Sequence, residues 1–314
     1  AIRAMESGQA DFLFCLGGNF ISATPDTIRT SAAVSKLSTG VHVSTKLNRS
    51  HLVQCSEMII LPCLGRTEID IQKSGPQFVT VENSMGIVHK SEGRLKPASS
   101  HLRSEPWIIA ELAATTLSDS TIDFRQLVDN YDDIRSLISE CISGFENYNE
   151  RVRENNGFYL PNPPKDECKF NTHTGLANFS INPLPNVDLL DDQFVMMTMR
   201  SHDQYNTTIY GLDDRYRGIK GNRRVVLMNP DDMLELGLKT RDIVNISSHF
   251  NDSVRKSNHW IVIPYKIPKR NIAAYFPEAN ELVPLDSTAD ISNTPTSKWI
   301  ICTISGQNST HEEE

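Results

Sequence analysis

Asp11-Phe-Leu-Phe-Cys-Leu16-Gly-Gly-Asn19 is the stretch that decides the fold of the first part of this chain. The apolar run that ends at Leu16 predicts a short buried strand, and the two glycines with an asparagine mark a turn after it. Thr24-Pro25-Asp26 favours a helix start, because it offers a hydroxyl N-cap, a proline at the first helical position and an acid near the positive end of the dipole. We expect that helix to run to about Leu37.

The same alternation continues through the next forty residues. Val41–Ser44 predicts a second strand, Asn48–Gln54 a short helical piece and Met58–Leu61 a third strand. Strands and helices that alternate at this spacing predict right-handed crossovers and a parallel, doubly wound sheet. We expect Phe78–Glu82 to add an irregular strand to this unit and Glu105–Leu117 to close it with a helix.

The pattern changes in the second half of the chain. Residues 123–142 place apolar side chains on one helical face and predict a helix, and the turn-rich residues 155–164 are expected to connect two domains. One helix, capped by Asn229 with Pro230 at its first position, follows later. The rest predicts a barrel or sandwich of short strands, at Gln193–Met199, Arg224–Met228, Ile243–Ser248, Trp260–Pro264, Ile272–Phe276 and Trp299–Ile304.

Length and composition exclude several classes of protein. The 314 residues suffice for two domains, and 39% hydrophobic with 22% charged residues indicates a chain that is neither disordered nor embedded in a membrane. No apolar window is long enough for a membrane span. With 31 basic and 39 acidic residues the net charge is −8, which argues against a general nucleic-acid binder.

The cysteines and the first residues indicate the cellular compartment of the chain and whether it is part of a longer protein. Six scattered cysteines without a C-x-x-C pair exclude a local zinc or iron–sulfur cradle built by this chain alone, and they indicate a reducing cytoplasm. The chain does not start with a Met, and its opening residues 1–8 lack a signal sequence and read as the end of a helix closed by Gly8. We therefore expect a fragment of a longer protein, with a frayed first helix on a complete protein as the alternative.

Two polar loops follow neighbouring predicted strands. The glycines of Gly17-Gly18-Asn19 would let backbone N–H groups approach a phosphate, although such a turn is also common without a ligand. It lacks the G-x-G-x-x-G spacing of an NAD site. Ser44–His51, which contains Thr45 and Lys46, offers hydrogen bonds and positive charge or is simply a solvated loop. Their shared position at strand ends favours one polar ligand, such as a ribose or a phosphate.

The densest polar run of the chain is Thr198–Thr208. Its Arg200 could grip a phosphate or carbonyl, whereas Gln204, Asn206, Thr207 and Thr208 could read the edge of a heterocycle. His202 and Asp203 do not predict an acid–base pair, because adjacent residues seldom face each other and no nucleophile accompanies them. The nine histidines form no ligand-spaced pair, so we predict no catalytic residue and no metal ligand here.

Two proline-stiffened loops present single polar groups, Asn280 and Lys298, which could equally be structural caps.

Several stretches, in order over nearly the whole chain, resemble the carboxyl-terminal portion of a molybdopterin oxidoreductase of the dimethyl-sulfoxide-reductase superfamily. The closest similarity is to the formate-dehydrogenase-like branch that includes bacterial acid-resistance proteins. The matching stretches are Leu16–Asn19, Ser44–His51, Ile60–Glu68, Val81–Met85, Arg200–Tyr210, Asp214–Gly218, Tyr275–Asn280 and Asn293–Lys298.

The resemblance implies a bis(molybdopterin guanine dinucleotide) cofactor with molybdenum, held between two domains. It implies the second half of a Rossmann-like domain at 1–120, a helical connection and linker at 121–167, a double-psi β-barrel that binds the dinucleotide at 168–305, and a mobile tail at 306–314. It places Gly17, Gly18, Asn19, Thr45 and Lys46 near one guanosine and its phosphates. In the barrel, the implied cofactor contacts are Arg200, His202, Gln204, Asn206, Thr207, Asn280 and Lys298.

What the resemblance implies for the whole enzyme lies largely outside this chain. The 4Fe-4S cluster, the molybdenum ligand and the lysine that relays electrons belong to upstream domains of the same protein, which would be partners of this part. The intact cytoplasmic enzyme would act on a small-molecule substrate and pass electrons to an unidentified partner, and this part alone would be inactive. The alternatives are a separate, non-catalytic cofactor-binding subunit or carrier, and an ordinary α/β enzyme that uses NAD or ATP.

Overall fold

The computed structural model describes residues 1–183, 188–207 and 210–306. The chain forms two compact units. The first combines Ala1–His42 and Leu47–Ile60 with Asn186–Glu314, and the second consists of Val43–Lys46 and Leu61–Pro185. The domain boundaries expected at residues 120 and 167 remain predictions. Of the tail expected at 306–314, residues 307–314 lie outside the described part.

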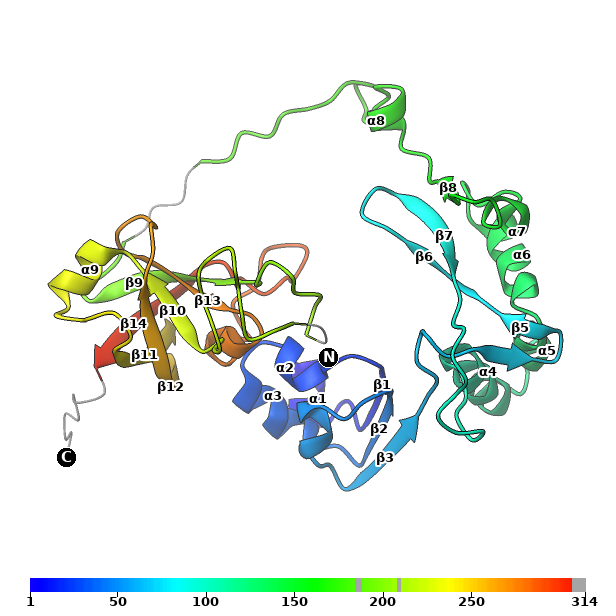
Figure 1. The fold of residues 1–314 in the computed structure, drawn as a ribbon, viewed down its shortest axis with the longest axis horizontal. Coiled ribbons are helices and arrows are strands. Elements are labelled where there is room, and N and C mark those ends of the chain that lie inside the picture. Colours follow the sequence, from blue (N-terminus) through cyan, green and yellow to red (C-terminus); the bar gives the residue numbers. More distant parts are fainter. Residues whose placement is uncertain (184–187, 208–209, 307–314) are drawn as a thin grey trace. The chain divides into compact units, whose positions relative to one another are not determined.

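The predicted parallel sheet is present at the start of the chain (Figure 1). It has three strands in the order β1-β2-β3, and helices connect them. Met5, Ile21, Val34 and Leu37 form a buried cluster behind the strands. The elements are α1 (Ile2–Glu6), β1 (Phe12–Leu16), α2 (Phe20–Ala23), α3 (Thr27–Val34), β2 (Thr39–Ser44), the 3-10 helix η1 (Arg49–Leu52) and β3 (Glu57–Pro62).

The helix expected from Thr24 to Leu37 begins later and is divided. Thr24 ends α2 and donates a hydrogen bond from its hydroxyl to the carbonyl of Phe20 at 2.8 Å, so it is not an N-cap. Asp26 caps α3 instead, in a left-handed conformation with φ of 49°. The prediction was wrong because the hydroxyl of Thr24 bonds to the preceding turn, leaving the acid to accept from the backbone N–H of Arg29.

In the second unit the strand expected at Phe78–Glu82 exists as β6 but does not join the parallel sheet. It pairs antiparallel with β7 through a tight turn in which Gly86 has φ of 78°, and β7 pairs antiparallel with β8. A short turn of this kind brings adjacent strands together antiparallel. The strands are β4 (Asp70–Gln72), β5 (Gly75–Gln77), β6 (Val79–Glu82), β7 (Ile87–Ser91) and β8 (Phe158–Tyr159).

One helix that the sequence predicted in the second unit is divided into two. The helix predicted over 123–142 is broken at Asn130, which ends α5 in an extended conformation and caps α6 with its side chain. The segment 155–164, expected to be irregular, contributes the buried Phe158 to the β6-β7-β8 sheet. The helices are α4 (Glu105–Thr116), α5 (Phe124–Asp129), α6 (Tyr131–Cys141), α7 (Tyr148–Arg151) and α8 (Pro163–Asp166).

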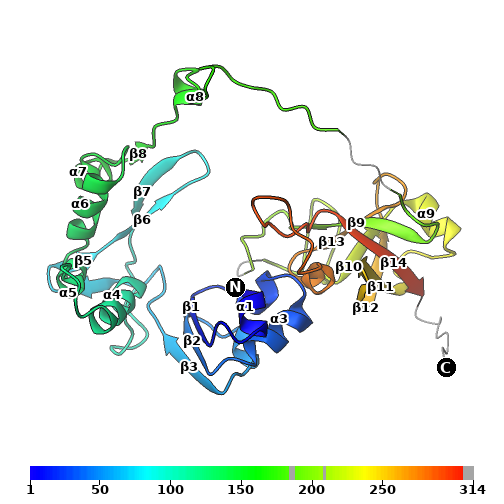
Figure 2. The same ribbon diagram turned by 180° about the vertical axis from the view of Figure 1, so that it is seen from behind.

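The strands of the second half close into a six-stranded barrel in the order β10-β12-β11-β14-β9-β13 (Figure 2). β10 runs parallel to β12, and β13 runs parallel to β9, whereas the other pairs are antiparallel. This confirms the barrel expected from short strands. The elements are β9 (Gln193–Met199), β10 (Val225–Met228), α9 (Pro230–Glu235), β11 (Ile243–Phe250), β12 (Ser253–Pro264), β13 (Asn271–Tyr275), the 3-10 helix η2 (Glu278–Leu282) and β14 (Ile300–Gly306).

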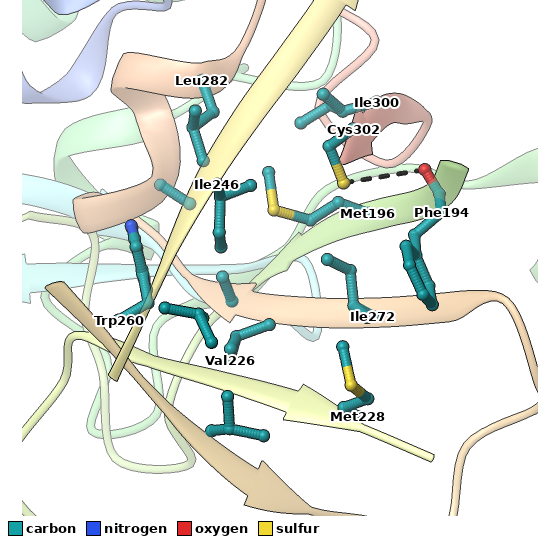
Figure 3. Close-up of a cluster of buried hydrophobic side chains, with 14 of the residues drawn as sticks. Phe194, Met196, Val226, Met228, Ile246, Trp260, Ile272, Leu282, Ile300 and Cys302 are labelled. Atoms are coloured by element: carbon teal, nitrogen blue, oxygen red, sulfur yellow. Dashed lines mark hydrogen bonds between the residues drawn. The ribbon is translucent and has the colours of Figure 1, made fainter. Parts of the chain in front are cut away.

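The barrel encloses the largest buried cluster of the described residues (Figure 3). Met196, Ile246, Trp260 and Ile272 are fully buried and point into its interior from four different strands. Asn229 caps α9 by accepting from the backbone N–H of Asp231 at 2.8 Å, as predicted. Within the described ranges, no helix is long and apolar enough to cross a membrane.

Gly157 is the backbone position that we expect to tolerate a side chain least. It has φ of 64°, and an added Cβ would lie 2.0 Å from the carbonyl oxygen of Val88. Gly86, in the same sheet, has φ of 78° but open space around it. Gly86→Ala should cost only the left-handed strain, about 1–2 kcal/mol, whereas Gly157→Ala should cost about 3 kcal/mol or more. Urea unfolding of both variants measures this, and equal losses would contradict it.

Candidate functional site

A polar cavity of about 310 Å³ lies within the first unit, between the amino-terminal segment and the loops of the barrel. Its lining mixes amides, hydroxyls, carboxylates and guanidinium groups with a nearly equal share of apolar surface. Two residues predicted as cofactor ligands from distant parts of the sequence, Asn19 and Thr207, both line it. The full lining is Asn19, Ser22, Thr27, Asn48, Arg49, Thr207, Tyr210, Arg224, Pro277, Glu278 and Glu281.

The amino-terminal wall of the cavity is a glycine turn held by an asparagine. Gly17 and Gly18 have φ of 66° and 76°, a conformation that side chains disfavour. The Asn48 side chain donates to the carbonyl of Gly18 at 2.8 Å, and the same residue accepts from the N–H of Ser50 at 2.9 Å. The hydroxyl of Ser50 donates to Asn19. The turn and η1 are thus fixed to each other before any ligand binds.

Arg223 organises the barrel wall, and sequence reasoning did not single it out. Its side chain is 4% exposed, and its guanidinium donates to the Ser201 hydroxyl at 2.8 Å and to Gln204 at 3.0 Å. It also donates to the carbonyl of Phe276 at 2.7 Å and forms an ion pair with Glu278 at 2.8 Å. A buried guanidinium with this many acceptors fixes both loops, because losing one acceptor would leave a charge without its partner.

Gln204 and Asn280, both predicted as ligands, use their side-chain amides inside the protein. Gln204 donates to the carbonyls of Asn206 and Phe276, each at 2.8 Å. Asn280 is buried and donates from its side chain to the carbonyl of Ser22 at 2.8 Å, while its own carbonyl accepts from the N–H of Asp26 at 2.9 Å. Both residues therefore shape the cavity by holding its loops.

Arg200 and Lys298 form a second positive group in the barrel. The Arg200 guanidinium lies 5.4 Å from the centre of the Phe276 ring, and Lys298 donates from its ammonium to the carbonyl of Thr198. Burial and, to a smaller extent, the nearby charge of Arg200 lower the pKa of Lys298. Two cations placed this close favour an anionic ligand such as a phosphate.

The other predicted ligands lie apart from the cavity lining. His202 is exposed and stacks on Tyr216, with ring centres 3.7 Å apart, and Asn206 is exposed with φ of 48°. Thr45 and Lys46 are exposed and belong to the second unit, where Thr45 lines a different cavity. Thr208 lies outside the described residues.

Three charged residues on the cavity wall escaped the sequence analysis: Arg224, Glu278 and Glu281. Arg224 forms an ion pair with Glu281 at 2.7 Å, and Glu278 pairs with Arg223. The loop Tyr275–Leu285 had been noted for Asn280 alone. The two glutamates fall on η2, three residues apart, a spacing that brings them to one face of a helix. That spacing is the signal that could have found them.

Among the described residues, the cysteines and histidines show no arrangement for metal chemistry. All six cysteines are free, and burial raises the pKa of the Cys63 thiol to about 11, with smaller contributions from nearby acids. This makes Cys63 a poor nucleophile and metal ligand at neutral pH. In the part of the chain that the structure describes, no group of three or more His, Cys, Asp or Glu residues could hold a metal ion.

Comparison with known proteins extends this picture. Residues 194–301, which span the barrel, match the family described as the molydopterin dinucleotide binding domain. An uncharacterised oxidoreductase of Mycobacterium tuberculosis is 49% identical over 307 residues, which cover 96% of this chain and 39% of that protein. The barrel is therefore similar to a molybdopterin dinucleotide-binding domain, and nearly the whole chain is similar to part of a protein named as an oxidoreductase.

Two further proteins are similar to nearly the whole chain, one in sequence and one in fold. Protein YdeP of Escherichia coli is 42% identical over 310 residues, covering 96% of this chain and 40% of YdeP. Acetylene hydratase from Pelobacter acetylenicus has a similar fold, with a TM-score of 0.62 and 12% identity over 97% of this chain and 46% of that one. The chain therefore spans about two fifths of the length of the curated relatives that it matches.

Asn280 should stabilise the protein through its hydrogen bond to the amino-terminal segment. Asn280→Ala leaves the carbonyl of Ser22 without its donor in a buried place, which should lower the free energy of unfolding by about 1–3 kcal/mol. Asn271→Ala is the matched control, because Asn271 donates to an exposed carbonyl, and it should cost less than about 0.5 kcal/mol. Urea unfolding tests this, and a loss for Asn280→Ala no larger than the control would contradict it.

Asp214 should make the barrel sensitive to acid. Burial raises the pKa of this carboxyl, but hydrogen bonds from Tyr275 at 2.8 Å and Arg217 at 2.5 Å outweigh burial and leave the pKa below its usual value. The native state then favours the ionised form, so this stabilisation is present above the ordinary pKa of 3.8 and is lost as the pH falls through the native pKa.

The test compares wild type with Asp214→Asn by urea unfolding across a range of pH. Above the ordinary pKa of Asp the variant should be less stable by about 1.5–3 kcal/mol, the usual contribution of hydrogen bonds to a charged group. The difference should shrink at lower pH. Asp252→Asn, in an exposed turn of the same barrel, is the control. A difference for Asp214→Asn that stays constant with pH would contradict this prediction.

Proposed function

We propose that this chain is the cofactor-binding carboxyl-terminal part of a molybdenum oxidoreductase, formate-dehydrogenase-like, that holds a bis(molybdopterin guanine dinucleotide) cofactor. The barrel match to a dinucleotide-binding family and the relatives named as oxidoreductases support the cofactor class and the general activity. The cavity that joins Asn19 to Thr207 is the observation that carries the proposal, since it brings both predicted loops to one place.

The residues of the cavity fit one nucleotide end of such a cofactor. A volume of about 310 Å³ lies at the lower end of the roughly 300–1,000 Å³ that small-molecule sites occupy, which suits a nucleoside phosphate but not the whole dinucleotide. Turns rich in glycine at strand ends are common phosphate sites. Gly17-Gly18-Asn19 is a turn of this kind and would bind a phosphate of the cofactor. The pair Arg200 and Lys298 would hold a further anionic part of the cofactor.

The protein's own contribution is binding and orientation. The cofactor, when bound, supplies the redox chemistry at its metal, and the protein holds it and tunes its electronics. In this proposal Asn19, Thr207 and the turn at Gly17 and Gly18 bind the nucleotide end, whereas Arg223 and Asn280 position the loops. We further propose a double-psi connection for the barrel, a cytoplasmic location, and a 4Fe-4S cluster and metal ligand in other domains of the longer protein. A small-molecule substrate would react there.

A second function shares the same site. The chain could be a separate, non-catalytic subunit or carrier that binds the cofactor or delivers it to an apo-enzyme. The gene sequence just upstream of Ala1 distinguishes the two. A continuous reading frame through a cysteine cluster supports the domain of a larger enzyme, and a start codon with a ribosome-binding site supports the carrier.

Binding can be tested on the 314-residue chain with cofactor released from a denatured molybdenum enzyme. We expect pterin absorbance to co-elute with the chain and no turnover of formate with a dye acceptor. Thr207→Val should weaken binding by about fivefold to tenfold, the loss of one hydrogen bond of roughly 1 kcal/mol. The control Thr116→Val, on α4 of the second unit, should bind as wild type does.

The outcomes separate the parts of the proposal. Absence of co-elution, or equal binding by both threonine variants, would contradict a cofactor site in this cavity. Clear turnover by the isolated chain would contradict its expected inactivity and would show that it carries a complete catalytic centre.

A further inference from the structure

Two imidazole rings meet inside the first unit, one from β2 and one from η1. The ring centres of His42 and His51 lie 5.0 Å apart, with their planes tilted by 45°. His42 is 4% exposed, and the Nε2 atoms of both rings are buried without a hydrogen-bond partner among the described residues. Buried polar atoms without a partner are rare in native proteins, so this pair has a cost that the fold alone does not explain.

The other nitrogen of His51 bonds to the backbone of Asn48, the residue that caps η1. The N–H of Asn48 donates to His51 Nδ1 at 3.0 Å, and the carbonyl oxygen of Asn48 lies 3.2 Å from the same nitrogen. Only a ring nitrogen without a proton can accept from the N–H, so this bond requires a neutral ring. A proton on Nδ1 would break the bond to the N–H and favour the carbonyl instead.

Asn48 connects this bond to the glycine turn of the cavity. Its side chain donates to the carbonyl of Gly18 at 2.8 Å and accepts from the N–H of Ser50 at 2.9 Å. The hydroxyl of Ser50 in turn accepts from the N–H of Ile21 at 3.1 Å. Asn48 itself lines the cavity. A change in the backbone at Asn48 therefore reaches the turn through a single side chain.

In the described part of the chain, no acidic group bonds to His51. Its Nδ1 contacts only Asn48, and α2, which packs against η1, has no titratable side chain. The titratable groups on the neighbouring segments of this unit and on the cavity wall shared with η1 are His42, Cys15, Cys55, Arg49, Arg224, Glu278 and Glu281.

These groups do not offset a positive charge on His51. The two glutamates are each paired with an arginine, and burial raises the pKa of the Cys15 thiol and so keeps it neutral. Arg49 adds a positive charge on η1 itself. Burial and, to a smaller extent, the charge of His51 lower the pKa of His42. His42 therefore stays neutral while His51 takes up a proton.

We infer that His51 is a positioning residue whose neutral ring holds the glycine turn of the cavity, and that one proton on this ring releases the turn in mild acid. We call the bonded chain His51–Asn48–Gly18 the turn latch. The neutral ring is part of the closed latch, so closure is favoured at higher pH and is lost as the pH falls. The latch needs no ligand, whereas its effect on cofactor binding rests on the proposed function.

Hydrogen exchange of the 314-residue chain without ligand, followed by NMR between about pH 5 and 8, tests the latch. The reporters are the backbone amides of Asn48 and Ile21. Their protection factor, which is the exchange rate of an unstructured peptide divided by the measured rate, should fall about fivefold to tenfold toward the acid end, as expected for the loss of one hydrogen bond. The fall should coincide with the change in the ring ¹⁵N shifts of His51.

His51→Gln separates the proton from the bond. A glutamine at this position of a helix can accept from the N-cap N–H, and its amide does not titrate. This variant should match wild type at the neutral end of the range and keep that protection at the acid end. His51→Phe should show low protection throughout. The control His101→Gln, at an exposed position in the second unit, should behave as wild type does.

Thermal unfolding at both ends of the range identifies any variant that fails to fold. In that case the wild-type comparison decides, since the protection of Asn48 and the ring ¹⁵N shifts of His51 must change together. Protection that is constant over the range, or a fall that persists in His51→Gln, would overturn the inference.

Cofactor binding is measured separately at the two ends of the range. Wild type should bind the released cofactor more weakly at the acid end, and His51→Gln should bind it equally at both. Equal binding by wild type while the turn opens would overturn the effect of the latch on binding. If the cofactor does not bind even at the neutral end, the proposed function fails, and the exchange data still decide whether the latch exists.

Discussion

The candidate site depends on a buried joint between the amino-terminal segment and the barrel. The side chain of Asn280 donates a hydrogen bond to the carbonyl of Ser22, and its backbone carbonyl accepts one from the N–H of Asp26. Asp26 in turn forms an ion pair with Arg255 at 2.7 Å. The side chains of Asp26 and Arg255 are 9% and 10% exposed, so their attraction is screened less than that of a surface pair. Because the two walls of the cavity belong to these two segments, a shift at the joint would change the cavity.

A second ion-pair network reinforces the joint near the surface. Arg29 pairs with Glu6 and with Asp286, and Arg3 reaches Asp286 at 2.7 Å. These groups are more exposed, so each pair contributes less than the buried contacts. The polar groups that shape the site are therefore of two kinds. Asn280 and Arg223 hold parts of the protein together by hydrogen bonds, whereas Asn19, Thr207 and Glu281 line the cavity.

Local signals predicted the elements that depend on neighbouring residues. The strand before Gly17, the barrel strand Gln193–Met199 and the Asn229 cap follow from short-range pattern, and the structure contains them. The start of α3 was missed because a hydroxyl at Thr24 can bond either forward or backward, and sequence alone does not decide. The sheet membership of β6 was missed because pairing partners are distant in sequence and depend on the turn at Gly86.

The candidate site, like the fold, could be predicted where neighbouring residues decide the structure and not where contacts between distant residues decide it. Sequence reasoning found the polar loops but could not tell which side chains line the cavity, because Gln204 and Asn280 are held by hydrogen bonds to residues distant in the sequence, whereas Thr207 lines the cavity. Arg223 was missed because an arginine before a strand is ordinary, and its importance arises from acceptors that lie 19 to 55 residues away in the chain.

The first unit is discontinuous, with residues 61–185 of the other unit between its amino-terminal segment and its barrel. During synthesis, at roughly 5–20 residues per second, the β1-β2-β3 segment leaves the ribosome many seconds before the barrel that buries Asn280 exists. For that interval the carbonyl of Ser22 and the backbone N–H of Asp26 lack the groups of Asn280 to which they bond in the folded unit. A ligand that contacts both walls of the cavity can therefore bind only after the barrel has been synthesised.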